Sequence, residues 1–180
     1  WKISDKKEWL EIVSQKEGDK VMIFANKPLD EKKNLDGLAQ QHLNEYLEKN
    51  GLRPTVAIHR GHSYNVRYTI EQLPSSAKVV LLGSCGGYQN LNDVLQACPQ
   101  AHIIATKQMG TAIVTQPLIN LIADKLSTGA DLHWPEIWKA LEAKFTDKIS
   151  KDRFEDYVPP HRNLGAIFMN AYNIMEQKKR

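Results

Sequence analysis

One cysteine and one histidine, each in a short loop with glycine, are the residues best suited to chemistry. Cys85 stands in the run GSCGG at residues 83–87, and His62 stands in the run HRGHS at residues 59–63. A thiol is mostly protonated at neutral pH, so a nucleophilic cysteine needs a nearby base or positive charge, and histidine supplies either. Glycines beside the cysteine let the backbone approach a substrate closely. The two loops therefore predict a catalytic pair of Cys85 and His62.

Short apolar runs predict the strands that hold these loops. Strands are expected at residues 21–25, 55–59, 79–82 and 102–105. Helices are expected at residues 29–49, 70–73, 91–97, 113–126, 135–145 and 164–176. Nearly continuous apolar strands separated by helices predict a three-layer α/β/α fold with a mostly parallel sheet. Ligands of such sheets bind outside the carboxyl ends of the strands, and both loops leave strands at that edge.

Each of these residues also has a plain structural interpretation. A cysteine after an apolar strand is often a small buried hydrophobe, and a glycine pair there is often only a turn. What favours chemistry is the coincidence of the two loops on one sheet edge. Two rivals stand nearby in the sequence. Cys98 ends a helical stretch before Pro99, which predicts a packing role, whereas His59 is an alternative base three residues before His62.

The order of the two loops resembles the caspase-like cysteine peptidases, the clan of caspases, legumains, gingipains, clostripain and separase. Gly61-His62 after an apolar strand is similar to the clan's histidine element. Ser84-Cys85 after the next apolar strand is similar to its nucleophile element, and the glycines after Cys85 fit the caspase signature. Residues 102–129 resemble bacterial CHAT-type domains, and the resemblance as a whole covers residues 21–141.

The resemblance implies a caspase-like fold, a relative of the flavodoxin-like folds, and hydrolysis of peptide bonds through a thioacyl-enzyme. Cys85 would attack the carbonyl of a peptide or protein substrate, and His62 would protonate the leaving amine. Backbone N–H groups of Ser63, Cys85 or Gly86 would form the oxyanion hole. No cofactor is implied. The residues expected to line the site are His59, Gly61, Ser84 and Gly87.

Two departures from the clan's pattern keep an inactive domain open. Ser63 stands where the clan normally has glycine, and His62 precedes Cys85 by only 23 positions, whereas the separation in caspases is about 50. The alternative function is a catalytically inactive caspase-like module that acts in protein interaction or regulation. Thiol alkylation separates the two, since a catalytic Cys85 should react well below the ordinary thiol pKa of about 8.5.

A second enzymatic alternative is a hydrolase of the α/β-hydrolase type. The run GSCGG also fits that fold's glycine–nucleophile–glycine elbow, which would require a histidine later in the sequence. His102, His133 and His161 are the candidates. None of these histidines is spaced with cysteine or carboxylate as metal ligands are, so no metal is expected.

Composition predicts a single globular domain over residues 1–180. Hydrophobic residues make up 42% of the chain and charged residues 25%, and the net charge is only +3. Basic residues are scattered among acidic ones, which argues against nucleic-acid binding, and no apolar run is long enough to span a membrane. The chain begins at Trp1 rather than Met, compatible with a mature form or a domain excised from a longer polypeptide with additional domains. Nothing in the sequence indicates a compartment.

Overall fold

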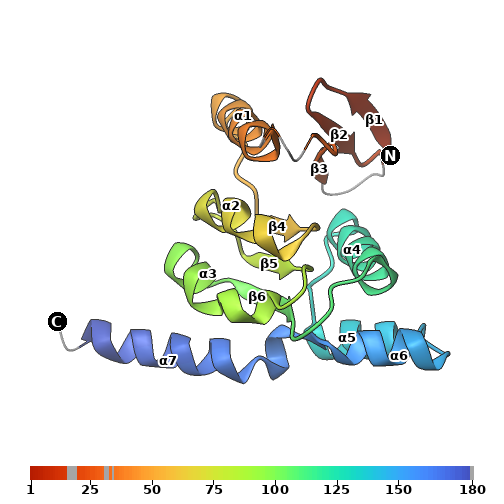
Figure 1. Cartoon of the computed structure of the whole chain (residues 1–180), viewed down its shortest axis with the longest axis vertical. Coiled ribbons are helices and arrows are strands. Elements are labelled where there is room, and N and C mark those ends of the chain that lie inside the picture. Colours follow the sequence, from red (N-terminus) through yellow and green to blue (C-terminus); the bar gives the residue numbers. More distant parts are fainter. Residues whose placement is uncertain (16–19, 31–32, 34, 179–180) are drawn as a thin grey trace. The chain divides into compact units, whose positions relative to one another are not determined.

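The computed structural model describes residues 1–15, 20–30, 33 and 35–178 (Figure 1). Contacts within the chain divide it into two compact units, residues 1–52 with 119–132 and residues 53–118 with 133–180. Helix α4 (Ala112–Ser127) begins in the second unit and ends in the first. That the whole chain is one domain stays a prediction.

The first unit contains an antiparallel sheet and helix α1, together with the end of α4. Its elements are β1 (Lys2–Asp5), β2 (Trp9–Val13), β3 (Met22–Asn26) and α1 (Leu35–Lys49), and the sheet order is β1-β2-β3. Helix α1 buries Ala39, Leu43 and Leu47. The ring of Tyr46 on α1 lies 5.2 Å from that of Trp9 on β2, so aromatic packing joins the helix to the sheet.

The strand predicted at residues 21–25 exists as β3, but the expectation that it joins a parallel sheet is wrong. It pairs antiparallel with β2, from Trp9 opposite Asn26 to Val13 opposite Met22. A short connection favours this pairing, because a parallel pair needs a crossover of a dozen or more residues. Helix α1 begins at Leu35 rather than at residue 29.

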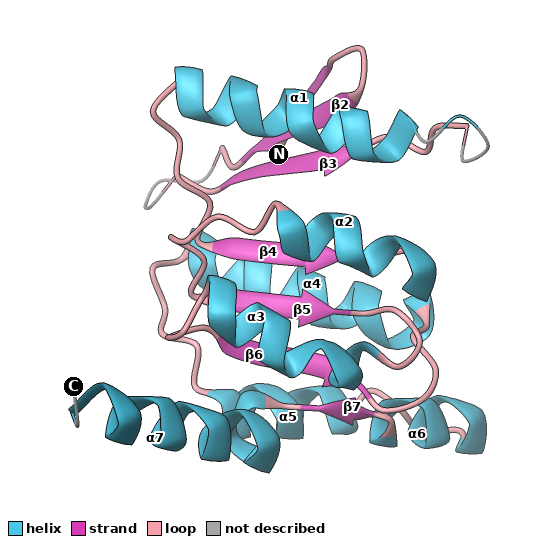
Figure 2. Ribbon diagram, turned by 60° about the vertical axis from the view of Figure 1, so that its left-hand side comes forward, coloured by secondary structure: helices cyan, strands magenta, loops and turns pink. Residues whose placement is uncertain are grey.

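The second unit is the α/β part of the chain (Figure 2). In chain order its elements are β4 (Val56–His59), η2 (Ser63–Asn65), α2 (Val66–Glu71), β5 (Val79–Leu82), η3 (Gly87–Asn90), α3 (Leu91–Ala97), β6 (His102–Thr106), the start of α4, α5 (Trp134–Glu142), α6 (Lys148–Glu155), β7 (Tyr157–Val158), η4 (Pro160–Arg162) and α7 (Leu164–Lys178). The sheet order is β4-β5-β6-β7. Strands β4, β5 and β6 run parallel, and β7 is antiparallel to β6.

Helices lie on both faces of this sheet. Figures 1 and 2 show α2 and α3 on one face and the start of α4 with α5 on the other. All four residues of β5 are buried, as expected for a strand covered on both sides. An α/β fold with a mostly parallel sheet is therefore confirmed for this unit.

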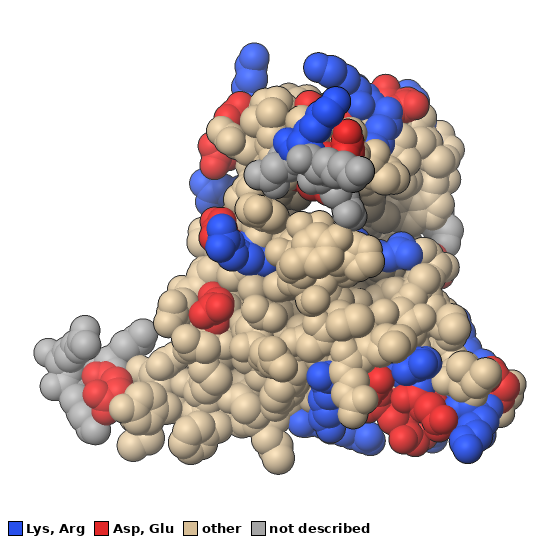
Figure 3. Space-filling view, viewed as in Figure 1, with Lys and Arg blue, Asp and Glu red and all other residues tan. Residues whose placement is uncertain are grey.

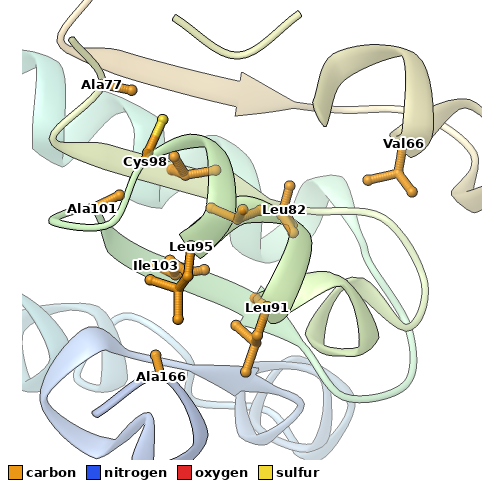
Figure 4. Packing of buried hydrophobic residues seen from close by; sticks show 12 residues of the cluster. Val66, Ala77, Leu82, Leu91, Leu95, Cys98, Ala101, Ile103 and Ala166 are labelled. Atoms are coloured by element: carbon orange, nitrogen blue, oxygen red, sulfur yellow. The ribbon is translucent and has the colours of Figure 1, made fainter. Parts of the chain in front are cut away.

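One core cluster fills the space between the sheet, α3 and α7 (Figure 4). Val80 and Leu82 of β5 and Ile103 of β6 contribute from the sheet side, and Leu95 contributes from α3. Cys98 belongs to this cluster with 1% of its surface exposed. Its predicted packing role is confirmed.

Most predicted elements of this unit are present, with one shift. The short helix expected at residues 70–73 is α2, which runs from Val66 to Glu71 after the 3-10 turn η2. Helix α6 and strand β7 were not predicted. Strand β7 has only two residues, too few for a hydrophobic period to show.

Candidate functional site

The candidate site lies at the carboxyl edge of the parallel strands, and the pairing of β4 with β5 brings its two loops together. His59 lies opposite Leu82 in the register, and the Gly83 N–H continues the ladder by donating to the His59 carbonyl at 3.0 Å. His62 follows His59 by three residues, and Cys85 follows Leu82 by three residues. The two loops therefore leave neighbouring strands at the same level.

Cys85 is exposed at the tip of its loop. Gly86 after it has φ +65°, a left-handed conformation that glycine adopts without steric cost. Ser84 before it is buried, and its Oγ has no hydrogen-bond partner in the described part of the chain. The turn thus presents the thiol to solvent while its neighbours stay in the protein.

Hydrogen bonds to the loop after β6 hold the cysteine turn. The Gly86 N–H donates to the Gln108 carbonyl at 2.8 Å, and the Gly87 N–H donates to the hydroxyl of Thr106 at 3.3 Å. The same hydroxyl donates to the Ser84 carbonyl. Because the Gly86 N–H is already engaged, it is the weakest of the three predicted oxyanion donors. For the N–H groups of Cys85 and Ser63, no acceptor is found among the residues that the structure describes.

The loop at residues 107–111 is a third part of the site that the sequence prediction missed. A Cβ on Gly110 would lie 1.8 Å from the Gly83 carbonyl oxygen, so the two backbones touch. This loop follows the carboxyl end of β6, and the edge rule that located the other two loops applies equally to it. Gly110 was the sequence feature that could have indicated a close backbone contact in this loop.

Strand β7 fixes this third loop from the other side. The Thr111 N–H donates to the Tyr157 hydroxyl at 2.8 Å, and that hydroxyl donates to the Thr111 carbonyl at 3.1 Å. The Lys107 N–H donates to the Asp156 carbonyl at 2.8 Å. Burial raises the pKa of Tyr157 above its usual range, and the charges of Asp156 and Cys85 add to this rise. Tyr157 is thus within electrostatic range of the candidate nucleophile.

Tyr157→Phe tests this support, because it removes only the hydroxyl. The Thr111 N–H and carbonyl lose their partner, which we expect to lower the free energy of unfolding by about 1–3 kcal/mol. The rate at which iodoacetamide alkylates Cys85 should change with it. Urea titration and mass spectrometry measure the two effects. Tyr172→Phe on α7, where the side chain is 55% exposed, is the matched control, and equal behaviour of both variants would contradict this role.

His62 is exposed and its ring stacks on another ring. Its centroid lies 5.1 Å from that of Tyr64, with 10° between the planes. Within the described residues, no hydrogen bond or ion pair joins His62 to Cys85. The fold brings the two loops together, but the two side chains are not paired in this structure.

Both ring nitrogens of His59, the alternative base, already have hydrogen-bond partners. His59 is 7% exposed, with Nδ1 2.8 Å from the Thr69 hydroxyl and Nε2 3.2 Å from the His62 carbonyl. A carbonyl only accepts, so Nε2 carries the proton and Nδ1 accepts from Thr69. Burial lowers the pKa of His59, and the bond to His62 partly opposes this. His59 therefore acts as a neutral brace of the turn that carries His62.

The neutral His59 predicts a loss of stability in mild acid. Its pKa is lower in the folded than in the unfolded chain, so protonation favours unfolding. The contribution of neutral His59 to the free energy of unfolding is complete above its unfolded pKa of about 6.5. It is lost as the pH falls toward and through its pKa in the folded chain. Urea titrations at several pH values should show this fall, and His59→Gln should reduce it. His161, whose pKa burial also lowers, accounts for a remainder, and an equal fall in the variant would contradict the assignment.

A pocket of about 200 Å³ lies beside the two loops. Arg60 and Gly61 line it from the histidine loop, Gly83 from the cysteine loop, and Thr111 and Thr115 from the third loop and α4. Arg60 is held by a 2.8 Å hydrogen bond from its Nη1 to Gln116 Oε1. Of the residues predicted to line the site, Gly61 lines this pocket, together with residues of the third loop. A role for His59, Ser84 and Gly87 in lining the site stays a prediction.

The histidines required by the α/β-hydrolase alternative lie at the other edge of the sheet. His102 is the first residue of β6, opposite Val79 at the start of β5, whereas Cys85 follows the end of β5. Its Nδ1 accepts from the Trp134 indole at 2.8 Å. His133 precedes Trp134, and His161 lies in η4, after β7 has run back antiparallel to β6. The geometry therefore gives this alternative no support.

Over the described residues, no three potential ligands are grouped to bind a metal ion, and none of the helices there has the length and apolar content needed to cross a membrane. No family model, curated protein or solved structure matches this chain.

Proposed function

We propose that this chain is a cysteine peptidase-like domain that hydrolyses peptide bonds with Cys85 as nucleophile and His62 as general acid and base. The observation that carries the proposal is the placement of both loops at one level on the carboxyl edge of neighbouring parallel strands. An exposed thiol on a turn with a left-handed glycine adds to it. The caspase-like fold remains part of this proposal.

The proposed reaction balances without a cofactor. The Cys85 thiolate adds to the substrate carbonyl, and the oxyanion is bound by the N–H groups of Cys85 and Ser63. His62, protonated by the thiol, passes its proton to the leaving amine, and a thioacyl-enzyme forms. Water, deprotonated by His62, then releases the acid and restores the thiol. Each oxyanion donor can lower the activation free energy by about 3 kcal/mol.

Peptide hydrolysis tests this proposal directly. A mixture of synthetic peptides incubated with the chain should yield fragments detectable by mass spectrometry. Cys85→Ser should abolish them, whereas Cys98→Ser should retain them after correction for folded protein, because Cys98 packs in the core. Fragments formed equally by Cys85→Ser would refute the assignment.

A second candidate is the inactive module that acts in protein interaction or regulation. The observation in its favour is the ring of His62, which stacks on Tyr64 and makes no hydrogen bond to Cys85 in the described chain. An unreactive Cys85 in a folded protein would select this candidate over the peptidase.

A further inference from the structure

The outward face of helix α7 carries large apolar side chains from Leu164 to Met175. Ala166 and Met169 pack toward the core cluster, and Gly165 approaches Tyr88 and Leu91 so closely that a Cβ would lie 2.8 Å from the Tyr88 hydroxyl. The large apolar side chains that point away are Leu164 (74% exposed), Ile167 (50%), Phe168 (71%), Tyr172 (55%), Ile174 (47%) and Met175 (60%). The helix is therefore apolar on both sides, a pattern typical of buried helices.

These side chains form one continuous stripe. Leu164, Phe168, Ala171 and Met175 recur at spacings of four, three and four, which is the seam of a helix that packs against another helix. Only Glu176 and Lys178 are charged within α7. In Figure 3 the surface over α7, along the lower left edge, carries almost no charge.

The stripe is larger than a monomer ordinarily exposes. Exposed fractions of 47–74% on six large side chains leave on the order of 700 Å² on each copy, against the roughly 800 Å² per partner of a standard interface. The largest apolar patch of a typical monomer is about 300–600 Å². The exposed area thus approaches what one partner contributes to a standard interface.

We propose that α7 is a homodimer interface, in which the helices of two copies pack antiparallel about a two-fold axis near the middle of the helix. A two-fold interface uses the same patch on both copies, and this stripe is self-complementary. Antiparallel packing sets Leu164 of one copy against Met175 of the other.

Light scattering of the whole chain after size exclusion tests the proposal. We expect a mass twice the 20.5 kDa of one chain. Phe168→Glu, at an exposed position, should give a folded monomer. Ile149→Glu on α6, where the side chain is 66% exposed, is the matched control and should remain dimeric. Circular dichroism checks that both variants are folded.

Cysteine substitutions at the two ends of the stripe test the antiparallel arrangement. In a Cys85→Ala background, Leu164→Cys mixed with Met175→Cys should form a disulfide-linked dimer faster than either alone. A wild-type monomer at all concentrations would overturn the proposal and leave another segment or protein to cover α7. A dimer that Phe168→Glu leaves intact would overturn it equally.

Discussion

Replacing His62 by alanine is expected to lower peptide hydrolysis by about 10³-fold or more, as removal of one member of a catalytic pair does elsewhere. Without the imidazole the thiol stays protonated at neutral pH, and the leaving amine receives no proton. Because the side chain is exposed, the free energy of unfolding should hardly change. Rates with the best substrate from the peptide mixture, and urea titration, measure the two quantities.

The present orientation of His62 does not oppose this role. A stacked ring pair is worth about 0.5–1.5 kcal/mol, and exposed side chains change rotamer within nanoseconds. Turning the ring from Tyr64 toward Cys85 therefore costs little once substrate is bound. Tyr64→Leu, which removes the stack, should leave the hydrolysis rate within about threefold of the wild type. A His62→Ala variant as active as the wild type would remove His62 from the mechanism.

Gly110→Ala is expected to cause the largest loss of stability in the second unit. The added Cβ would lie 1.8 Å from the Gly83 carbonyl oxygen and 2.8 Å from the Ser84 carbonyl carbon. These are backbone atoms beside the cysteine turn, so no side chain can move aside. We expect the free energy of unfolding to fall by about 3 kcal/mol or more, measured by urea titration.

Gly61→Ala is the matched control, since it also changes a glycine in a loop at this edge. Its Cβ would meet only the His59 ring, at 3.5 Å, which is ordinary contact. Its stability should change by no more than about 1 kcal/mol. If Gly110→Ala were as stable as Gly61→Ala, the close contact of the third loop with the cysteine loop would be wrong.

The parallel strands were predictable because burial on both faces leaves a continuous apolar run. Val79 to Leu82 is such a run, and β5 has these bounds. Strands β1 and β2 were missed because charged residues interrupt them, as Glu11 does in β2. The sheet to which β3 belongs depended on those two strands, so its antiparallel pairing could not be predicted from its own apolar residues.

The positions of the two loops were also predictable, because the carboxyl ends of parallel neighbours meet at one edge. The different environments of His59, which is buried and hydrogen-bonded, and His62, which is exposed, were not predictable. The environment of His59 depends on Thr69, whose hydroxyl is 2.8 Å from His59 Nδ1 and whose proximity comes from the start of α2 at Val66 rather than at residue 70. The contact of Tyr157 with Thr111 joins residues 46 positions apart, beyond the reach of any local pattern.

The catalytic pair is tested most directly by the pH dependence of alkylation at each cysteine, followed by mass spectrometry. Cys98 is an internal reference, because burial raises the pKa of its thiol and it is 1% exposed. We predict that Cys85 reacts with iodoacetamide well below the ordinary thiol pKa of about 8.5, and that His62→Ala removes this reaction at low pH. A Cys85 that reacts only near the ordinary pKa, with the same profile in His62→Ala, would contradict the proposed pair.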